Sequence, residues 1–210
     1  GIRTVVDGSH APGHIPLDLS TLHADIYTAN CHKWMCTPKG SAFLWVSPDL
    51  QPLIPPLIVS WGNEIPTAGD GAFVDEHEYL GTRDVSPFLS VPFAIEWMRQ
   101  QQWHDVQRHG RALAQMAMQG LIAINGIEPL CADGQDPQLQ MAAVLLPHST
   151  DTDHMKQWLY AEQAIEVVVH RWLGRPILRC STHAHTTSSD IDRLVNAVQM
   201  YQREMPYAGT

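Results

Sequence analysis

The spacing of hydrophobic residues predicts short strands and helices in the first part of the chain. Apolar runs predict strands over residues 3–6, 24–29 and 42–46, and a short helix is expected over 18–23. Residues 47–85 show no clear period and are rich in proline and glycine, so we expect a long loop there. Such loops are usually functional or disordered, and the apolar and aromatic residues of this one favour a function.

The pattern becomes helical from Ser86 onward. Ser86-Pro87 is a favourable helix start, and Val91, Ile95 and Met98 would share one face of that helix. The other predicted elements are helices over 103–125, 151–163 and 191–203, a strand over 141–146, and a hairpin of 165–170 with 176–180. Ser188-Ser189-Asp190 is expected to cap the last helix.

This order of elements predicts an α/β fold in two parts. Residues 1–85 have the pattern of the trailing part of an α/β unit. Residues 86–210 have that of a smaller α+β unit that opens with a long helical segment. A chain of 210 residues, 44% of them hydrophobic, is long enough to bury a core in one domain or a domain and a half.

Composition and charge exclude several classes of protein. With 13 basic and 22 acidic residues the formal charge is −9, and no basic stripe is present to bind a nucleic-acid backbone. No apolar run approaches the roughly 20 residues that span a bilayer, and no secretory signal is found. The four cysteines are scattered without a CxxC pair, which predicts reduced thiols in a cytoplasmic protein.

The 12 histidines raise the question of a zinc site. His183 and His185 are two residues apart, and His10 and His14 are four residues apart. Neither pair comes with the cysteine or carboxylate partners of a known zinc pattern, so no metal is expected.

Two residues near the start of the chain are candidates for chemistry. Asp7 ends an apolar strand, where α/β folds place ligand groups, and its carboxylate could pair with a cationic ring nitrogen. From position alone, a helix or loop cap is the commoner role for such an aspartate. Lys33 sits beside Trp34 and Met35, and a lysine in partly apolar surroundings can act as an amine nucleophile or base. Taken alone, an ordinary surface lysine is the simpler interpretation.

Two later segments could bind anions. Gly81-Thr82-Arg83-Asp84 precedes a helix start, where backbone N–H groups and a hydroxyl can hold an anion, although a simple loop and N-cap is common there. Arg179 ends a late strand, and its planar guanidinium suits a carboxylate. A salt bridge to one of the many acidic residues is the alternative for Arg179.

Together these segments are more specific than any one of them. The order and spacing of the following motifs resemble the class V aminotransferase family of pyridoxal-phosphate enzymes, and within it the isopenicillin N epimerase-like branch: Val5-Val6-Asp7-Gly8-Ser9-His10-Ala11-Pro12-Gly13, Asn30-Cys31-His32-Lys33-Trp34, Pro38-Lys39-Gly40, Val59-Ser60-Trp61-Gly62, Gly81-Thr82-Arg83-Asp84 and Arg179-Cys180-Ser181-Thr182-His183. The resemblance covers essentially the whole chain.

The resemblance implies a role for four residues around the cofactor. Lys33 matches the lysine that forms the internal Schiff base with pyridoxal phosphate. Asp7 matches the aspartate that pairs with the pyridinium nitrogen and keeps the ring protonated as an electron sink. His10 matches a position near the phenolic oxygen of the cofactor, and His32 matches a position that contacts its phosphate.

The resemblance also implies a partner subunit and a substrate. Thr82 matches a threonine that reaches the cofactor phosphate of the neighbouring subunit, which implies a homodimer with shared active sites. Arg179 matches the arginine that binds the α-carboxylate of an amino-acid substrate. The chain departs from the common pattern at Asn30, Cys31 and His185, where many relatives have small residues or tyrosine.

Family members are about twice as long as this chain, so it is expected to be the C-terminal half. The implied fold is the C-terminal part of a fold type I transferase: residues 1–85 would be the trailing part of the large cofactor-binding α/β domain, and residues 86–210 the linking helices and small α+β domain. The missing part would carry residues that stack on the cofactor and most of its phosphate cradle.

Several functions stay open at this point. The first hypothesis is an enzyme that acts at Cα of an amino acid or amino-acid-ended peptide, as an epimerase or an aminotransferase, with Lys33 as the base. The second is a cysteine desulfurase or selenocysteine lyase, but the segment before Arg179 holds no nucleophilic cysteine. The third is a catalytically silent truncated remnant.

Overall fold

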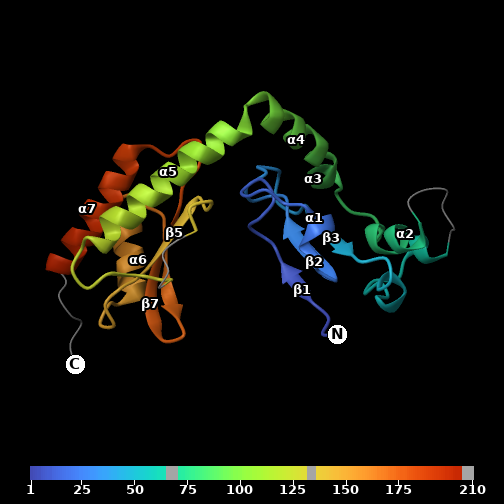
Figure 1. Cartoon of the computed structure of the whole chain (residues 1–210), viewed down its shortest axis with the longest axis horizontal. Coiled ribbons are helices and arrows are strands. Elements are labelled where there is room, and N and C mark those ends of the chain that lie inside the picture. The colour runs from blue at the N-terminus through green and yellow to red at the C-terminus, as the bar shows by residue number, and fades with distance from the viewer. Residues whose placement is uncertain (65–70, 132–135, 205–210) are drawn as a thin grey trace. The chain divides into compact units, whose positions relative to one another are not determined.

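A computed structural model of the chain describes residues 1–64, 71–131 and 136–204. The chain forms two compact units, Gly1–Gln100 and Gln101–Thr210 (Figure 1). The first unit extends beyond residue 85 because the helices that begin at Ser86 associate with it. The predicted division at residues 85 and 86 concerns the domains of a longer enzyme, and it stays a prediction.

The first unit is built on a three-stranded sheet with the order β1-β2-β3. Strand β1 (Val5–Asp7) pairs in parallel with β2 (Ile26–Asn30), and β3 (Ala42–Val46) pairs antiparallel with the other edge of β2. Helix α1 (Leu19–Leu22) lies in the crossover between β1 and β2, and its N-cap Asp18 accepts a backbone hydrogen bond from the first turn. The three predicted strands and this helix are confirmed.

The segment predicted as a long loop contains helical turns. Two of them are 3-10 turns, η1 (Gln51–Leu53) and η2 (Trp61–Asn63), and α2 (Ala72–Glu78) is an α-helix. The prediction of a loop throughout residues 47–85 is therefore wrong at α2. The N-cap residue of this helix is Gly71, which has no capping side chain, so the usual sequence signal of a helix start is missing.

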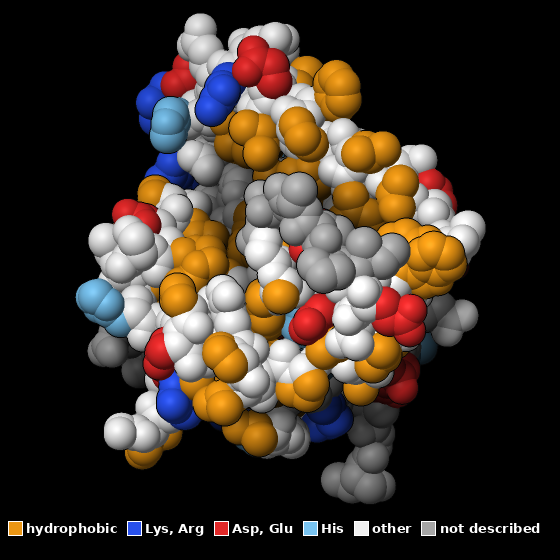
Figure 2. All heavy atoms as spheres, turned by 90° about the vertical axis from the view of Figure 1, so that its right-hand side faces the viewer, with side chains coloured by type: hydrophobic (Ala, Val, Ile, Leu, Met, Phe, Trp, Pro, Cys, Tyr) orange, Lys and Arg blue, Asp and Glu red, His pale blue; other side chains and the backbone are white. Residues whose placement is uncertain are grey.

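Helices α3 (Ser86–Leu89) and α4 (Val91–Gln100) end the first unit and confirm the predicted helix start at Ser86. None of their residues is buried in this chain. Figure 2 shows hydrophobic side chains gathered on the face of the molecule that it views. The exposed large hydrophobic residues between positions 53 and 97 are Leu53, Leu57, Ile58, Val59, Trp61, Tyr79, Val85, Leu89, Phe93, Ile95 and Trp97. A large exposed apolar surface is typical of one that another protein surface covers.

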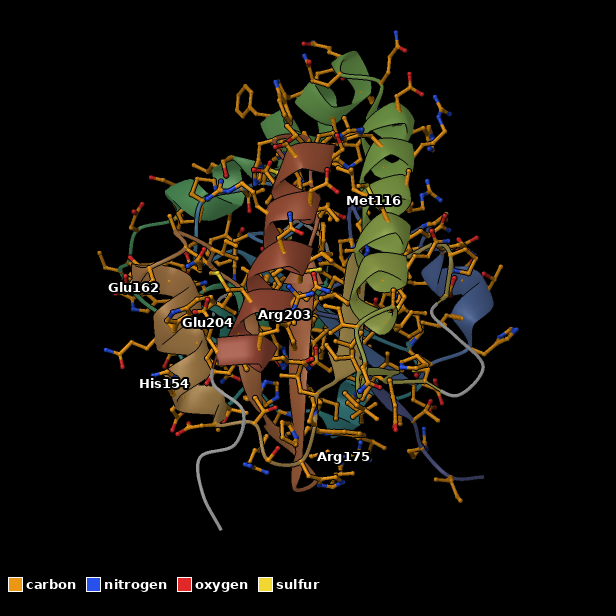
Figure 3. All side chains as sticks on the ribbon, turned by 90° about the vertical axis from the view of Figure 1, so that its left-hand side faces the viewer. Met116, His154, Glu162, Arg175, Arg203 and Glu204 are labelled. Carbon is orange, nitrogen blue, oxygen red and sulfur yellow. The ribbon has the colours of Figure 1, made fainter. Side chains whose placement is uncertain are left out.

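The second unit is a four-stranded antiparallel sheet with helices packed against it. Its elements are α5 (Trp103–Ile122), β4 (Glu128–Pro129), β5 (Met141–Leu145), α6 (Thr152–Ala161), β6 (Val168–Trp172), β7 (Arg175–Ser181) and α7 (Ser188–Glu204). The strand order is β4-β5-β7-β6, and all neighbours are antiparallel. Helices α5 and α7 lie side by side, as Figures 1 and 3 show, and α6 packs against β6. The predicted strand, hairpin and three helices are confirmed, while β4 was not predicted.

One hydrophobic core joins the helices to one face of this sheet. Leu121 of α5, Leu159 of α6, Leu178 of β7 and Val198 of α7 are fully buried in it. Because strand side chains alternate between faces, the core side of β7 carries Leu178 and Cys180. Arg179 between them therefore belongs to the opposite face of the sheet.

The start of α7 differs from its prediction. The helix begins at Ser188, so Ser188-Ser189-Asp190 forms its first turn, and the N-cap residue lies before it. Thr187 is the capping residue: its hydroxyl accepts a hydrogen bond from the Asp190 N–H at 3.3 Å, and Asp190 Oδ2 accepts one from the Thr187 N–H at 2.9 Å. This reciprocal pair is a capping box shifted by one residue from the predicted position.

Candidate functional site

Asp7 lies at the C-terminal end of β1, as predicted, and its carboxylate is held by the next turn. The backbone N–H of Ser9 donates to Asp7 Oδ1 at 3.0 Å, and the Ser9 hydroxyl donates to the same oxygen. These hydrogen bonds lower the pKa of Asp7 from its usual value, and the charge of Lys33 acts in the same direction. Asp7 is therefore an ionised carboxylate with Lys33 and His10 in its electrostatic surroundings.

Lys33 follows the end of β2, in a turn that is anchored by its neighbour. Lys33 itself is exposed, whereas Trp34 is buried with 6% of its surface exposed. The indole N–H of Trp34 donates to His10 Nδ1 at 3.0 Å, and the ring stacks on His14 with 4.1 Å between centroids. The lysine is thus accessible on a turn whose next residue is fixed against the loop that follows Asp7.

Gly13 makes this packing possible. Its backbone has φ +78°, and a Cβ placed on it would lie 2.7 Å from the carbonyl oxygen of Trp34. No side chain fits at that distance, and the left-handed conformation also favours glycine. The close approach of the two backbones at Gly13 sets the position of the turn that carries Lys33.

His32 lies on the other side of Lys33 in the sequence, and one of its ring nitrogens is engaged. Its Nδ1 donates to the carbonyl oxygen of Ser41 at 3.0 Å, and the N–H of Cys31 donates to the same oxygen at 3.1 Å. With Nδ1 protonated, Nε2 of a neutral His32 carries a lone pair, and it becomes a donor only in the imidazolium form.

Thr82 is exposed in the loop before α3 and has no part in the helix cap. The N-cap residue of this helix is Val85, and the Oδ1 of Asp84 just before it accepts the Ser86 N–H at 2.9 Å. Hydrogen bonds from the side chain and backbone of Ser86 lower the pKa of Asp84. Arg83 stacks its guanidinium on the Phe88 ring at 4.9 Å. In this segment Asp84 therefore holds the start of the helix through Ser86, and Thr82 is exposed beside it.

Arg179 lies in β7 of the second unit, between Ala143 of β5 and Val168 of β6. Its Nε is buried and has no hydrogen-bond partner within the part of the chain that the structure describes. Among the same residues it forms no ion pair, although acidic residues outnumber basic ones. The alternative interpretation, a salt bridge to a nearby acid, is therefore not observed in residues 1–64, 71–131 and 136–204.

The four cysteines differ in their exposure to solvent. All four are free, with Cys31 and Cys180 buried and Cys36 and Cys131 exposed. Burial raises the pKa of Cys180 to about 11, so its thiolate is scarce near neutral pH. The expectation of reduced cysteines in a cytoplasmic protein stays a prediction.

The sequence-predicted residues thus fall into groups by unit. The first unit holds Asp7 at the end of β1, His10, His32 and Lys33 on the loops that follow β1 and β2, and Thr82, whereas Arg179 belongs to the second. A separate hollow of about 840 Å³ in the second unit is lined by residues that include His154, Arg203 and Glu204, labelled in Figure 3, and by none of the predicted site residues.

Two further negative findings concern the described residues. None of their helices has both the length and the apolar character needed to cross a membrane. No three His, Cys, Asp or Glu side chains of the described ranges come together as a metal site would require.

Sequence reasoning missed the contacts of Trp34 and His14. His14 is 2% exposed, and its Nδ1 donates to the His10 carbonyl oxygen at 2.9 Å. The spacing of His10 and His14 by four residues is the only sequence signal for these contacts, and it also fits a zinc pair. Its observed role is a hydrogen-bonded pair that receives the Trp34 ring.

Comparisons with known proteins agree with the predicted family. The family model "Aminotransferase class-V" matches residues 1–194. The isopenicillin N epimerase of Streptomyces clavuligerus is 34% identical over 208 residues, which cover 94% of this chain and 52% of that protein. A probable cysteine desulfurase of Streptomyces coelicolor is 26% identical over 95% of this chain and 50% of that protein. The chain spans about half the length of these curated relatives.

Among solved structures, the cysteine desulfurase CsdA of Escherichia coli matches with a TM-score of 0.76 and 22% identity, over 96% of this chain and 52% of that one. This likeness confirms the predicted fold, which is the C-terminal part of a fold type I transferase. Because the family model covers nearly all of the chain, this protein belongs to the class V aminotransferase family.

Proposed function

We propose that this chain is the C-terminal half of a pyridoxal-phosphate-dependent enzyme that acts at Cα of an amino acid or of an amino-acid-ended peptide. The observation that carries the proposal is the ionised Asp7 beside an accessible Lys33 on a turn fixed by Trp34. The relative named isopenicillin N epimerase, 34% identical over 208 residues, favours epimerase-like chemistry, with an aminotransferase as the close variant.

The donors and charges in the first unit fit this cofactor. Its aldehyde requires an amine, which Lys33 supplies, and its ring nitrogen requires an anion, which the low pKa of Asp7 supplies. When bound, pyridoxal phosphate stabilises negative charge that develops at Cα of the substrate. His10 would contact the phenolic oxygen. His32 would contact the phosphate through Nε2 as an imidazolium, because Nδ1 already donates to Ser41.

Residues of the chain would also bind the substrate and move its proton. Arg179, with a buried Nε that lacks a partner among the described residues, would bind the substrate carboxylate in a bidentate pair. The amine of Lys33 would take the Cα proton of the substrate. Thr82 would reach the cofactor phosphate of a neighbouring subunit, which makes a homodimer part of the proposal.

The β6–β7 hairpin disfavours persulfide chemistry of the desulfurase kind. Such an enzyme would need a nucleophilic cysteine on a loop before Arg179, but here Leu173-Gly174 is a two-residue turn with φ +47° and +78°. Cys180 is buried on the opposite face from Arg179, with its pKa raised to about 11. A lyase that needs no cysteine remains the second candidate, since relatives named L-cysteine desulfhydrase-like proteins match about half of the chain.

The first experiment tests cofactor binding. The chain is mixed with pyridoxal phosphate, reduced with borohydride, and analysed by visible spectroscopy and peptide mass spectrometry. We expect the cofactor to be trapped on Lys33 and the signal to be lost in Lys33→Ala. Lys39→Ala, which removes an exposed lysine of the same unit, should leave it unchanged. A chain that binds no cofactor would leave only the remnant interpretation for these 210 residues.

The second experiment identifies the reaction. Candidate amino acids are incubated with the loaded protein in deuterated water. Deuterium at Cα with inversion indicates an epimerase, a 2-oxo acid indicates an aminotransferase, and release of sulfide from cysteine indicates a lyase. Exchange that is lost in Arg179→Ala but kept in Arg175→Ala would support the carboxylate role, because Arg175 of the same strand already pairs with Glu128 at 3.5 Å.

A further inference from the structure

Trp34 makes a specific contact with a ring nitrogen of His10. Its indole Nε1 lies 3.0 Å from His10 Nδ1, and the indole ring stacks on His14 at an interplanar angle of 17°. His14 in turn donates from Nδ1 to the carbonyl oxygen of His10 at 2.9 Å. The indole is therefore held in place by two contacts to one loop, and its N–H direction is set by packing.

The chemistry of the indole determines the protonation of its partner. An indole N–H can only donate, so His10 Nδ1 must offer a lone pair to accept it. A neutral imidazole that accepts at Nδ1 carries its proton at Nε2. We propose that Trp34 is a positioning residue that holds His10 in the neutral Nε2–H tautomer, so that His10 presents a hydrogen-bond donor to the phenolic oxygen of the cofactor.

The same residue also links His10 to Lys33. Trp34 is the residue after Lys33, and its carbonyl oxygen is the atom closest to the missing Cβ of Gly13. A shift of the Trp34 backbone at this close approach would therefore move both the indole that contacts His10 and the turn that carries Lys33. The part of the proposal that concerns the phenolic oxygen rests on the proposed cofactor. The tautomer itself does not.

The first test reads the tautomer directly and needs no cofactor. Nitrogen-15 correlation spectra of the histidine ring give the protonation of each ring nitrogen, and the His10 signals are assigned by their absence in His10→Gln. We expect Nε2 protonated and Nδ1 unprotonated in the unmodified chain. Protonated Nδ1 would overturn the proposal without any variant, so the test does not depend on the folding of a mutant.

The second arm removes the N–H but keeps an aromatic ring. Trp34→Phe should move the His10 Nδ1 signal and allow both tautomers, whereas Trp45→Phe, an indole of β3 in the same unit, should leave the His10 signals in place. An unchanged Nδ1 signal in folded Trp34→Phe would refute the role of the indole.

The third arm measures cofactor affinity by absorbance titration. Loss of one hydrogen bond should weaken binding about three- to tenfold in Trp34→Phe. His10→Leu should lose a similar factor, and His10→Gln, whose amide can both accept and donate, should recover part of it. Equal affinities in Trp34→Phe and the unmodified chain would show that the indole N–H does not contribute to cofactor binding. Failure of the unmodified chain to bind would instead reject the proposed function and leave the tautomer result standing.

Discussion

Replacement of Gly13 by alanine should damage the first unit and the lysine turn together. Two costs combine at this position. An L-residue at a left-handed φ of +78° costs about 1–2 kcal/mol. The new Cβ would also lie 2.7 Å from O and 2.8 Å from C of Trp34 and 3.0 Å from N of Met35. These are backbone atoms, so the turn itself must shift, and overpacking of this kind costs about 1–3 kcal/mol.

The expected loss for Gly13→Ala is therefore about 2–5 kcal/mol. Gly174→Ala is the matched control, because Gly174 has the same φ of +78° and no atom within 4 Å of its Cβ position. It should lose only the backbone part, about 1–2 kcal/mol. The difference between the two variants then measures the collision with the Trp34 backbone.

Hydrogen exchange followed by mass spectrometry is the suitable assay, because it reports the two units separately. Protection of β2 gives the stability of the first unit, and protection of β7 gives that of the second. Cofactor loading should fall in Gly13→Ala as the turn that carries Lys33 moves. Equal losses of stability in the two variants would contradict the argument from close approach.

Three further predictions concern the second unit. Thr187→Val should lower its stability by about 1 kcal/mol in denaturant titrations, through loss of the capping box. Hydrogen bonds from Thr187 lower the pKa of Asp190 in the folded state from its ordinary value of 3.8. The ionised carboxylate therefore stabilises the fold above pH 3.8, and this stabilisation is lost as the pH falls through the lower pKa of the folded state. A smaller loss of stability between pH 5 and about pH 2 in Thr187→Val than in the unmodified chain would support this linkage. Leu178→Ala should cost about 2–5 kcal/mol, because the side chain is fully buried, and a loss below 1 kcal/mol would contradict its place in the core. Maleimide at pH 7.5 should label Cys131 rapidly and Cys180 only after unfolding, as checked by peptide mass spectrometry.

Most of the secondary structure could be predicted because its signals are local. The strands at β2, β3 and β5 have dense apolar runs, and α5 and α7 repeat their apolar residues at helical spacing. Helix α2 lacks a capping side chain, so no local signal marks its start. The predicted position of the α7 cap differs from the observed one because four successive residues, Thr187 to Asp190, are all common cap types. Only the three-dimensional hydrogen bonds select Thr187 among them.

The candidate site could be predicted in composition but not in its internal contacts. Asp7 and Lys33 follow parallel neighbouring strands, and such strands bring the groups at their ends together. The role of Trp34 depends on contacts of its indole with His10 and His14, in a loop about 20 residues earlier in the sequence. No periodicity of the sequence reveals such contacts. Likewise, the lack of a partner for Arg179 Nε among the described residues is a property of its neighbours in the sheet, and the sequence shows only that many acids were available.

The residues assigned to the cofactor and to the substrate are held in place by different contacts. Substitutions near each of them should therefore have different effects. Lys33 sits on a turn, and it is held through Trp34 by a hydrogen bond, a ring contact and one close backbone approach. Arg179 sits in a strand that is paired on both sides, where the backbone is fixed by the sheet. Substitutions around the indole should therefore change cofactor loading without unfolding the second unit. Substitutions of the core side of β7 should lower the stability of the second unit before they change the chemistry at Lys33.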